Sequence, residues 1–466
     1  MSYTSRSNRP NEYAHKSNHS QVINDKDVKA FLKSCELPKE NENIDLVNDG
    51  VIIKQEELEN NPISIIITVD GGYTDVEVKK SFPSSRIAFY QFGAFWLDLD
   101  DWKKLGAEKP FIAPEDIAKY NDLERIKLVL PSKHITYSKS KNFVDSVRKT
   151  LYDFFMQKDD AGAMLIETLS WLIFEEYDTK SSAEIYELKN PYEGEIKSLN
   201  LNKTDMNIDF TFDFKDGKVY LTDIFRIHEI IDEELGAGGA LGYITSIVEQ
   251  LIIIHYIRYI LKIQPTLLSK ILFIRDGSLA FFGQTARLHR PMRKLINFLN
   301  ANYDIFLVGL EKSGNFVDHA HEITSNILIP SGKTGLALEK PITGSKLKSG
   351  HTLLASNSYI YKYIIPGDSS KTLYGGTSYY SGKIIHKSKS GNVYVASLPI
   401  LNKEDIVNPH KNHYLKLDTI LDTLDSIKCD MYDNSLIPVA LVNRMVSLAN
   451  KPSKVLLEKF AQANLK

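Results

Sequence analysis

Two segments share one pattern that constrains the fold more than any other feature of the sequence. Each is a continuous apolar run followed by Asp and Gly: IIITVDGG contains Asp70, and ILFIRDG contains Asp276. Apolar runs without alternation are typical of strands buried on both faces of a sheet. We expect Gly71-Gly72 to end the first strand. Because open α/β sheets place binding residues at the carboxyl ends of such strands, both aspartates are expected at one sheet edge.

For each aspartate considered separately, an ordinary turn is the alternative to a binding site. Asp-Gly is among the commonest turn dipeptides. A hairpin turn, however, is normally flanked by alternating, half-exposed strands, and neither of these strands alternates. The matched pair therefore favours a shared site.

A third acid lies on the long apolar segment between the two strands. Glu249 has small hydroxyl residues one helical turn before it and isoleucines one turn after it. A carboxylate on such a face is costly unless a cation or strong donors meet it, and a salt bridge is the alternative to a metal. Three converging carboxylates favour Mg²⁺ or Mn²⁺. Two such ions are a common device for displacement at phosphorus.

The other predicted elements alternate between strands and helices, which indicates an α/β fold. The expected strands are 63–69, 74–78, 87–99, 271–274, 305–308, 359–365 and 392–398, and the expected helices are 142–157, 161–177, 239–261, 285–300 and 315–326.

Composition fits a soluble globular protein, with 43% hydrophobic and 25% charged residues. No stretch approaches 18 uninterrupted apolar residues, so we expect no membrane-spanning helix. The longest candidate, 251–263, is interrupted by one histidine and two basic residues. The N-terminus lacks the apolar region of a secretory signal. Cys35 and Cys429 fit neither a disulfide framework nor a zinc site, and we expect a cytoplasmic protein.

The net charge of −2 does not identify a nucleic-acid binder, but phosphate binding needs only a local basic surface. The run RLHRPMRK follows the second aspartate and could contact phosphates there. Its candidate DNA-binding residues are Arg287, Arg290, Arg293 and Lys294. A second basic group lies at 383–389. A solvated charged face is the alternative for either run.

The order VDGG, a helical Glu, RDGSL and VGLEKSG resembles the NurA nuclease family over about residues 62–320. The resemblance implies an RNase H-like mixed sheet flanked by helices, with insertions and a helical C-terminal part. It also implies that Asp70 and Asp276 are metal ligands. Glu249 matches the family's helical acid, and Glu167 is the alternative.

The resemblance further predicts the domain organisation. Residues 1–45 are expected to be a flexible extension and 46–466 a NurA-type nuclease domain. Within that domain we expect the RNase H-like core at about 62–100 and 240–400, a helical insertion at about 140–235 and C-terminal helices at about 403–466.

Two further residues bear on catalysis. Lys312, in VGLEKSG, follows the strand at 305–308 and could contact a phosphate as a point charge, although a solvent-facing loop lysine explains it as well. Asn443 stands where the resemblance implies a histidine, and an Asn side chain cannot shuttle a proton near neutral pH.

The function expected from these features is that of a DNA nuclease dependent on Mn²⁺ or Mg²⁺, with two ions. The resemblance implies an exonuclease or single-strand endonuclease, a homodimer, that works with a HerA-type hexameric ATPase in end processing or anti-phage defence. SGKT at 331–334 lacks the first glycine of a Walker A loop, because position 327 is Ile, so ATP hydrolysis is assigned to the partner. The alternative function is a scaffold that caps the ATPase without cleaving DNA.

Overall fold

The computed structural model describes residues 16–36, 38, 44–106, 125–179, 185–192, 197–325, 346–429, 435–448 and 451–465. The SGKT segment and much of the predicted N-terminal extension lie outside these residues. The chain divides into two units, 1–44 and 45–466. In the first unit, α1 (Lys16–Asn24) is followed by α2 (Lys26–Ser34), which begins at Asp25, whose carboxylate accepts hydrogen bonds from two backbone amides of the first turn.

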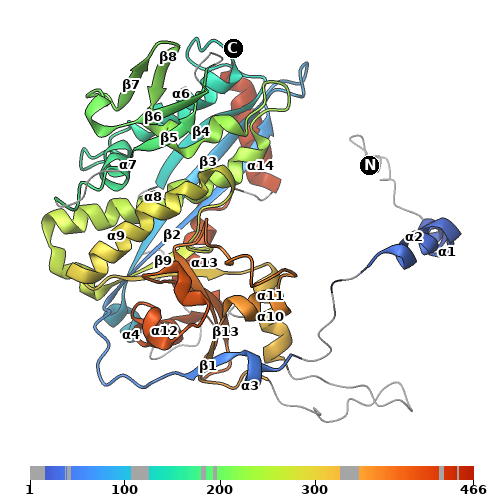
Figure 1. Cartoon of the computed structure of the whole chain (residues 1–466). Helices are drawn as coiled ribbons and strands as arrows, with labels where there is room; N and C mark the ends of the chain where they lie inside the picture. Colours follow the sequence, from blue (N-terminus) through green and yellow to red (C-terminus); the bar gives the residue numbers. More distant parts are fainter. Residues whose placement is uncertain are drawn as a thin grey trace. The chain divides into compact units, whose positions relative to one another are not determined.

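A nine-stranded sheet organises the second unit (Figure 1). In spatial order its strands are β1 (Val51–Lys54), β11 (His351–Leu354), β12 (Ser381–Lys387), β13 (Val393–Pro399), β10 (Phe306–Glu311), β9 (Ile271–Asp276), β2 (Ile65–Glu77), β3 (Arg86–Asp98) and β4 (Arg125–Lys133). β9 pairs in parallel with both β2 and β10, and the other neighbours in the sheet are antiparallel.

The strand order defines the fold class. The order β4-β3-β2-β9-β10, in which three antiparallel strands are extended by two strands parallel to β2, is that of an RNase H-like core. Helices flank this sheet, and the C-terminal region is largely helical. The predicted fold class is therefore confirmed. β4 lies outside the two segments that the sequence assigned to the core.

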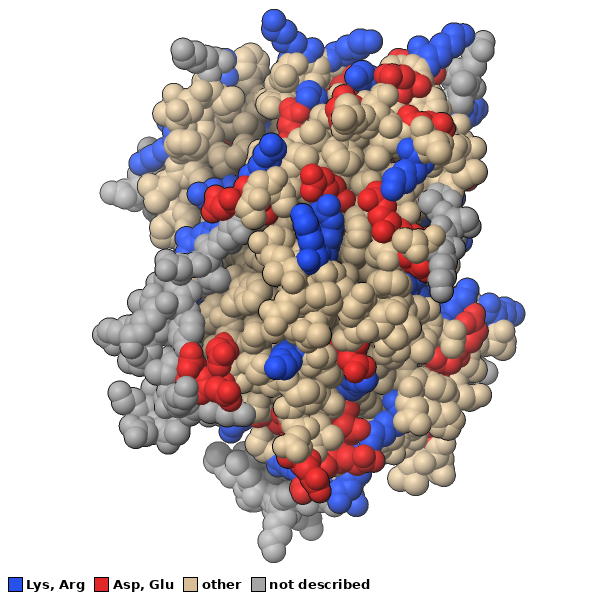
Figure 2. Space-filling model, turned by 90° about the vertical axis from the view of Figure 1, so that its left-hand side faces the viewer, with Lys and Arg blue, Asp and Glu red and all other residues tan. Residues whose placement is uncertain are grey.

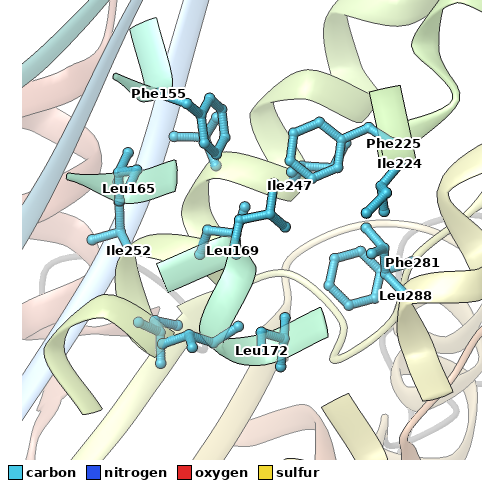
Figure 3. Packing of buried hydrophobic residues seen from close by; sticks show 14 of the residues in the cluster. Phe155, Leu165, Leu169, Leu172, Ile224, Phe225, Ile247, Ile252, Phe281 and Leu288 are labelled. Atoms are coloured by element: carbon cyan, nitrogen blue, oxygen red, sulfur yellow. The ribbon is translucent and has the colours of Figure 1, made fainter. Parts of the chain in front are cut away.

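The principal helices lie on the two faces of the sheet, and each face has its own hydrophobic core. On one face lie α6 (Phe143–Phe155), α7 (Leu165–Ile173), α8 (Leu241–Ile263) and α9 (His289–Asn302). Figure 3 shows aliphatic and aromatic side chains of α6, α7 and α8 packed together in this core. On the other face lie α12 (Leu417–Ser426) and α13 (Ile437–Val446).

The remaining elements are short or peripheral. They are α3 (Leu46–Asp49), α4 (Leu99–Gly106), α10 (Asn315–Thr324), α11 (Asn357–Tyr363) and α14 (Lys451–Asn464), with the strand pairs β5 (Tyr186–Lys189) and β6 (Ser198–Leu201), β7 (Thr211–Phe214) and β8 (Gly217–Tyr220), and β14 (Lys428–Cys429) and β15 (Ser435–Leu436).

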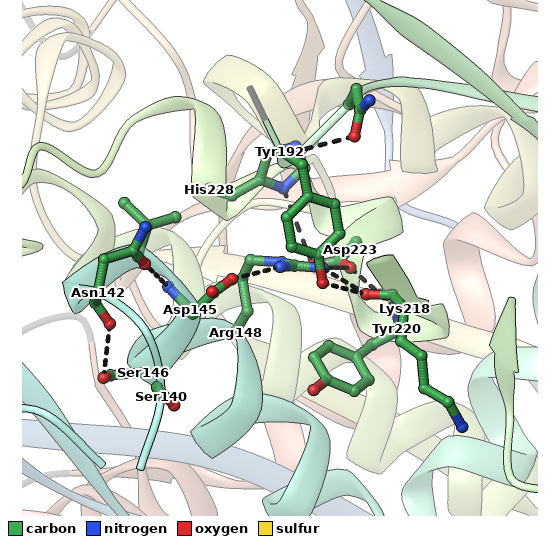
Figure 4. A network of polar contacts seen from close by, with 12 residues as sticks. Ser140, Asn142, Asp145, Ser146, Arg148, Tyr192, Lys218, Tyr220, Asp223 and His228 are labelled. Atoms are coloured by element: carbon green, nitrogen blue, oxygen red, sulfur yellow. Dashed lines mark hydrogen bonds and ion pairs between the residues drawn. The ribbon is translucent and has the colours of Figure 1, made fainter. Parts of the chain in front are cut away.

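A buried polar network holds the insertion between β4 and α8 together (Figure 4). The Arg148 guanidinium, on α6, donates to both carboxylate oxygens of Asp223 at 2.9 and 2.7 Å and to Asp145 at 2.7 Å. It also lies over the Tyr192 ring, 4.8 Å from the centroid. Because Asp223 follows the β7–β8 hairpin, the network ties that hairpin to α6.

α8 is a core helix with the composition of a membrane span. By length and composition, Gly238–Ile263 could cross a membrane, with a mean hydropathy of 1.4 in its most apolar window. His255, Arg258 and Lys262 divide this helix into shorter apolar runs, and for that reason the sequence did not predict a membrane-spanning length. In the structure 67% of that window is buried, and the helix belongs to the core that covers β2 and β9.

Two sequence-based element assignments were wrong. β2 does not end at Gly71-Gly72 but continues to Glu77 in pairing with β3. The glycines instead make room for helices, because a Cβ at Gly72 would lie 2.7 Å from the backbone oxygen of Val446 on α13. The predicted strand 359–365 is largely helix α11, whose N-cap is the Ser356 hydroxyl, at 3.2 Å from the Tyr359 amide.

The close approach of α13 to β2 gives a first prediction. Gly72→Ala should lower the free energy of unfolding by about 1–3 kcal/mol, since the added methyl group must push the α13 backbone away. Gly242→Ala is the matched control, because nothing lies within 4 Å of its Cβ position. That helical substitution should be neutral or stabilising by up to about 1 kcal/mol. Urea unfolding measures both, and equal stability of the two variants would show that α13 does not lie against Gly72.

Candidate metal-binding site

The pairing of β2 with β9 brings the two aspartates together. Ile65 to Val69 pair in parallel with Ile271 to Arg275, so the next residues along the two strands are Asp70 and Asp276. Asp276 is the last residue of β9, whereas Asp70 is followed by the continuing β2–β3 ribbon. Both predicted aspartates therefore meet where the parallel pairing ends.

The two carboxylates project to the face covered by α13. Side chains alternate between the faces of a strand. A Cβ at Gly72 would meet α13, whereas one at Gly71 would lie 3.1 Å from Cγ2 of Thr245 on α8. Asp70, next to Gly71, therefore projects to the α13 face, where its partner on β3 is Gly93. At Gly93 a Cβ would lie 2.9 Å from Cγ1 of Val446, so this glycine makes room for a side chain of α13.

Asp276 shares that face for the same reason. The residue before it, Arg275, projects to the α8 face, where its guanidinium lies 2.7 Å from the Ser246 hydroxyl. By alternation, Asp276 projects to the opposite face, beside Asp70. Gly277, with φ +121°, then turns the chain, and its amide donates to the Leu310 carbonyl of β10 at 2.6 Å. At Asp276-Gly277 the two alternatives therefore hold together: the aspartate ends the strand, and the glycine after it forms the turn.

The electrostatics of this pair favour a proton on Asp70. Burial, followed by the neighbouring Asp276 carboxylate, raises the pKa of Asp70 to about 7. The Gly71 amide, which donates to Asp70 at 2.8 Å, and the Lys312 ammonium oppose this pKa rise. Lys312 Nζ lies 2.5 Å from Asp276 Oδ2. The sequence-predicted lysine therefore belongs to the same site.

Glu249 is held on the other face of the sheet. It is 5% exposed, and its carboxylate forms an ion pair with Arg275 at 3.1 Å. Burial raises the pKa of Glu249 to about 8, Arg275 lowers it, and Asp70 and Asp276 raise it further. The aspartates are thus near enough to affect its charge, but the group that contacts it is Arg275. The salt bridge that the sequence left open as an alternative is present.

Glu167 lies away from the aspartates. Its carboxylate is 3.2 Å from the Arg258 guanidinium. Arg258 is nine residues beyond Glu249 on α8 (258 − 249 = 9), which corresponds to about 14 Å along a helix. The structure therefore does not bring the alternative third acid to this site.

A second charged group, which was not predicted from the sequence, surrounds Ser278, two residues after Asp276. Glu311, the last residue of β10, accepts a hydrogen bond from the Ser278 hydroxyl and forms an ion pair with Lys383. Lys383 is 2% exposed, and burial lowers its pKa to about 7. Lys383 belonged to the second predicted basic group, and the available signal for its burial was its place directly before Ile384-Ile385.

The described residues fit one cation better than two. Asp70 and Asp276 share a space in which a divalent ion could replace the proton that burial favours. Oε2 of Glu249, by contrast, is bound to Arg275. Within the described ranges no group of three or more His, Cys, Asp or Glu side chains is arranged to hold a metal ion. The predicted three-acid ligand set is not assembled in this structure.

The predicted DNA-binding residues divide into two pairs. Arg293 donates to the carbonyls of Ile400 and Tyr379, and Lys294 forms an ion pair with Glu175 at 2.6 Å, so both stabilise packing. Arg287 and Arg290 are exposed, although Arg287 also donates to a backbone carbonyl. On the face drawn in Figure 2, Lys and Arg side chains are interspersed with acidic ones rather than gathered in one stripe.

No protein-family model and no curated protein sequence matches the chain. Among solved structures, the crystal structure of the NurA nuclease from Sulfolobus solfataricus aligns over 97% of this chain and 99% of that chain, with 8% identity and a TM-score of 0.32. A crystal structure of NurA with manganese aligns over the same shares, with 12% identity and a TM-score of 0.22. Both scores are too low to establish a shared fold, so the fold class rests on the strand order.

The raised pKa of Asp70 predicts how stability depends on pH. Between the ordinary pKa of 3.8 and about 7, the folded protein keeps a proton that the unfolded chain has lost. The metal-free protein should therefore lose stability as pH rises through this range. Asp70→Asn removes that loss and should be more stable than wild type at pH 8 by more than about 1 kcal/mol, with a smaller difference near pH 4.

Thermal unfolding with and without Mn²⁺ measures this effect. Mn²⁺ should raise the melting temperature of the wild type and leave that of Asp70→Asn unchanged. Asp160→Asn, at an exposed turn, is the matched control and should behave as the wild type. A pH profile of Asp70→Asn that parallels the wild type would contradict the assigned burial and coupling of Asp70.

Proposed function

We propose that this protein is a DNA nuclease that depends on Mn²⁺ or Mg²⁺ and cleaves from ends or within single strands. The observation that carries the proposal is the pair of neighbouring carboxylates, the buried Asp70 and the partly buried Asp276, on adjacent parallel strands of an RNase H-like core. Burial and the neighbouring Asp276 carboxylate raise the pKa of Asp70, and a divalent cation between the two carboxylates would stabilise the charged form of Asp70. The NurA-like motifs of the sequence support DNA as the substrate.

In this proposal, different residues of the chain would bind the metal ion and the phosphates of the DNA. Asp70 and Asp276 would hold the ion, which would supply an activated water and stabilise charge at phosphorus. Lys312, beside Asp276, is placed to contact a phosphate of the bound strand as a point charge. Arg287 and Arg290, in the segment that follows β9, would contact phosphates further along the strand. A second ion would require Glu249 to leave Arg275.

The biological setting is part of the proposal and is supported by the motif resemblance alone. A HerA-type hexameric ATPase would feed DNA to a homodimer of this chain, in the cytoplasm, during end processing or defence against phages. A single flexible extension at 1–45 and one nuclease domain at 46–466 belong to the same proposal.

A non-catalytic scaffold that caps the ATPase is the second candidate. The observation that favours it is that protein cations already meet two of the acids: Lys312 contacts Asp276, and Arg275 contacts Glu249. Acids neutralised in this way need no metal for stability. Asn443, in place of a titratable histidine on α13, agrees with this second candidate.

A cleavage assay on linear and single-stranded DNA with Mn²⁺ distinguishes the two candidates. Asp70→Asn and Asp276→Asn should each lower the rate by about 100-fold or more, since even residues that only orient metal ligands are worth about 10- to 100-fold. Lys127→Ala, at an exposed position of β4, is the control and should cleave as the wild type.

The assay should be run with and without a HerA-type ATPase. Activity that appears only with the ATPase would still support the nuclease, provided that both aspartate variants abolish it. Cleavage that survives in both variants would contradict the proposal. No metal-dependent cleavage by the wild type under either condition would favour the scaffold.

A further inference from the structure

A cavity of about 520 Å³ lies on α8 away from the two aspartates. Its walls come from the turn before α7, from α7 and the segment after it, from the last turns of α8 and from the end of α9. α8 leads into the amino end of β9, and α9 leads into the amino end of β10. The cavity therefore lies toward the edge of the sheet opposite to Asp276, which ends β9.

Four aromatic side chains form a row along the cavity. The ring centroids of Trp171 and Tyr177 are 5.0 Å apart, those of Tyr177 and Phe298 are 5.0 Å apart, and those of Phe298 and Tyr303 are 6.0 Å apart. All four residues line the cavity and are only partly buried. Partly exposed rings of this kind provide stacking surfaces for flat aromatic ligands such as nucleobases.

Basic side chains of α8 line the same cavity. Arg258 and Lys262 are one helical turn apart, and His255 lies one turn before Arg258, so all three lie on one face of the helix. These are the residues that interrupt the apolar run of α8. His255 is held between the Thr168 hydroxyl, at 2.8 Å, and the Asp159 carboxylate, at 3.2 Å.

The balance of charge in the cavity favours an anion. Glu167 is the acid among its lining residues, and it is paired with Arg258 through both terminal nitrogens of the guanidinium. Arg258 retains further donors, because a guanidinium has five. Lys262 is exposed and makes no ion pair or hydrogen bond within the described part of the chain. One ammonium is thus left for a ligand.

We infer that this cavity binds a nucleotide unit, with the base against the aromatic row and the phosphate at Arg258 and Lys262. Its volume is that of a small-molecule site. The unit is either a free mononucleotide or the phosphorylated end of a strand, which share the same chemistry. The inference does not depend on the proposed nuclease activity, because it uses neither aspartate.

Calorimetric titration of the full-length chain in EDTA tests the inference. The probes are AMP, adenosine, inorganic phosphate and a 5′-phosphorylated pentadeoxynucleotide. AMP should bind with a Kd in about the micromolar to millimolar range and at least about tenfold more tightly than adenosine or phosphate, because only AMP contacts both the rings and the cations. Tighter binding of the oligonucleotide than of AMP would identify a strand end as the source.

Two variants assign the binding to this cavity. Lys262→Glu should weaken AMP binding by about tenfold or more, and Lys127→Glu, an exposed lysine on β4, should leave it unchanged.

Three results would overturn the inference. The first is no binding of either AMP or the oligonucleotide. The second is binding by inorganic phosphate that equals binding by AMP, which would show that the rings contribute nothing. The third is binding that is the same in Lys262→Glu as in wild type, which would place the nucleotide elsewhere on the molecule.

Discussion

The parallel pairing of β2 with β9 is the constraint on which the candidate site depends. Five residues of each strand pair in register, and the next residue on each is an aspartate. Two carboxylates are thereby held at neighbouring positions on one face, in an environment that raises the pKa of Asp70 to about 7. The apolar residues that precede them anchor both strands in the cores on either face of the sheet, so the acids cannot separate without loss of buried surface.

Strand alternation then divides the surrounding charges between the two faces. Arg275 and Asp276 are consecutive, and therefore one reaches Glu249 under α8 while the other joins Asp70 near α13. The first group is a buried ion pair in which each partner satisfies the other. The second group has two carboxylates and the single ammonium of Lys312, and it retains a net negative charge. That imbalance is the physical reason why the proposed cation is placed at the aspartates rather than at Glu249.

The sequence predicted those parts of this site that depend on neighbouring residues in the chain. Unbroken apolar runs identified both strands, and the fold class followed from the alternation of elements and the motif resemblance. The partner of Glu249 could have been inferred, since an arginine inside an apolar strand needs a buried acid. The role of Gly71-Gly72 could not, because the backbone of Val446, far away in sequence, is what excludes a side chain there. β12 was missed because its buried Lys383 and His386 resemble a surface basic group.

Electron paramagnetic resonance of Mn²⁺ added to the metal-free protein tests the central claim most directly, because it counts bound ions without requiring DNA or a partner. The structure predicts one tightly bound Mn²⁺ per chain in the wild type, its loss in Asp276→Asn and its retention in Glu249→Gln. Undiminished Mn²⁺ binding by Asp276→Asn would contradict the account, as would loss of the ion in a folded Glu249→Gln variant.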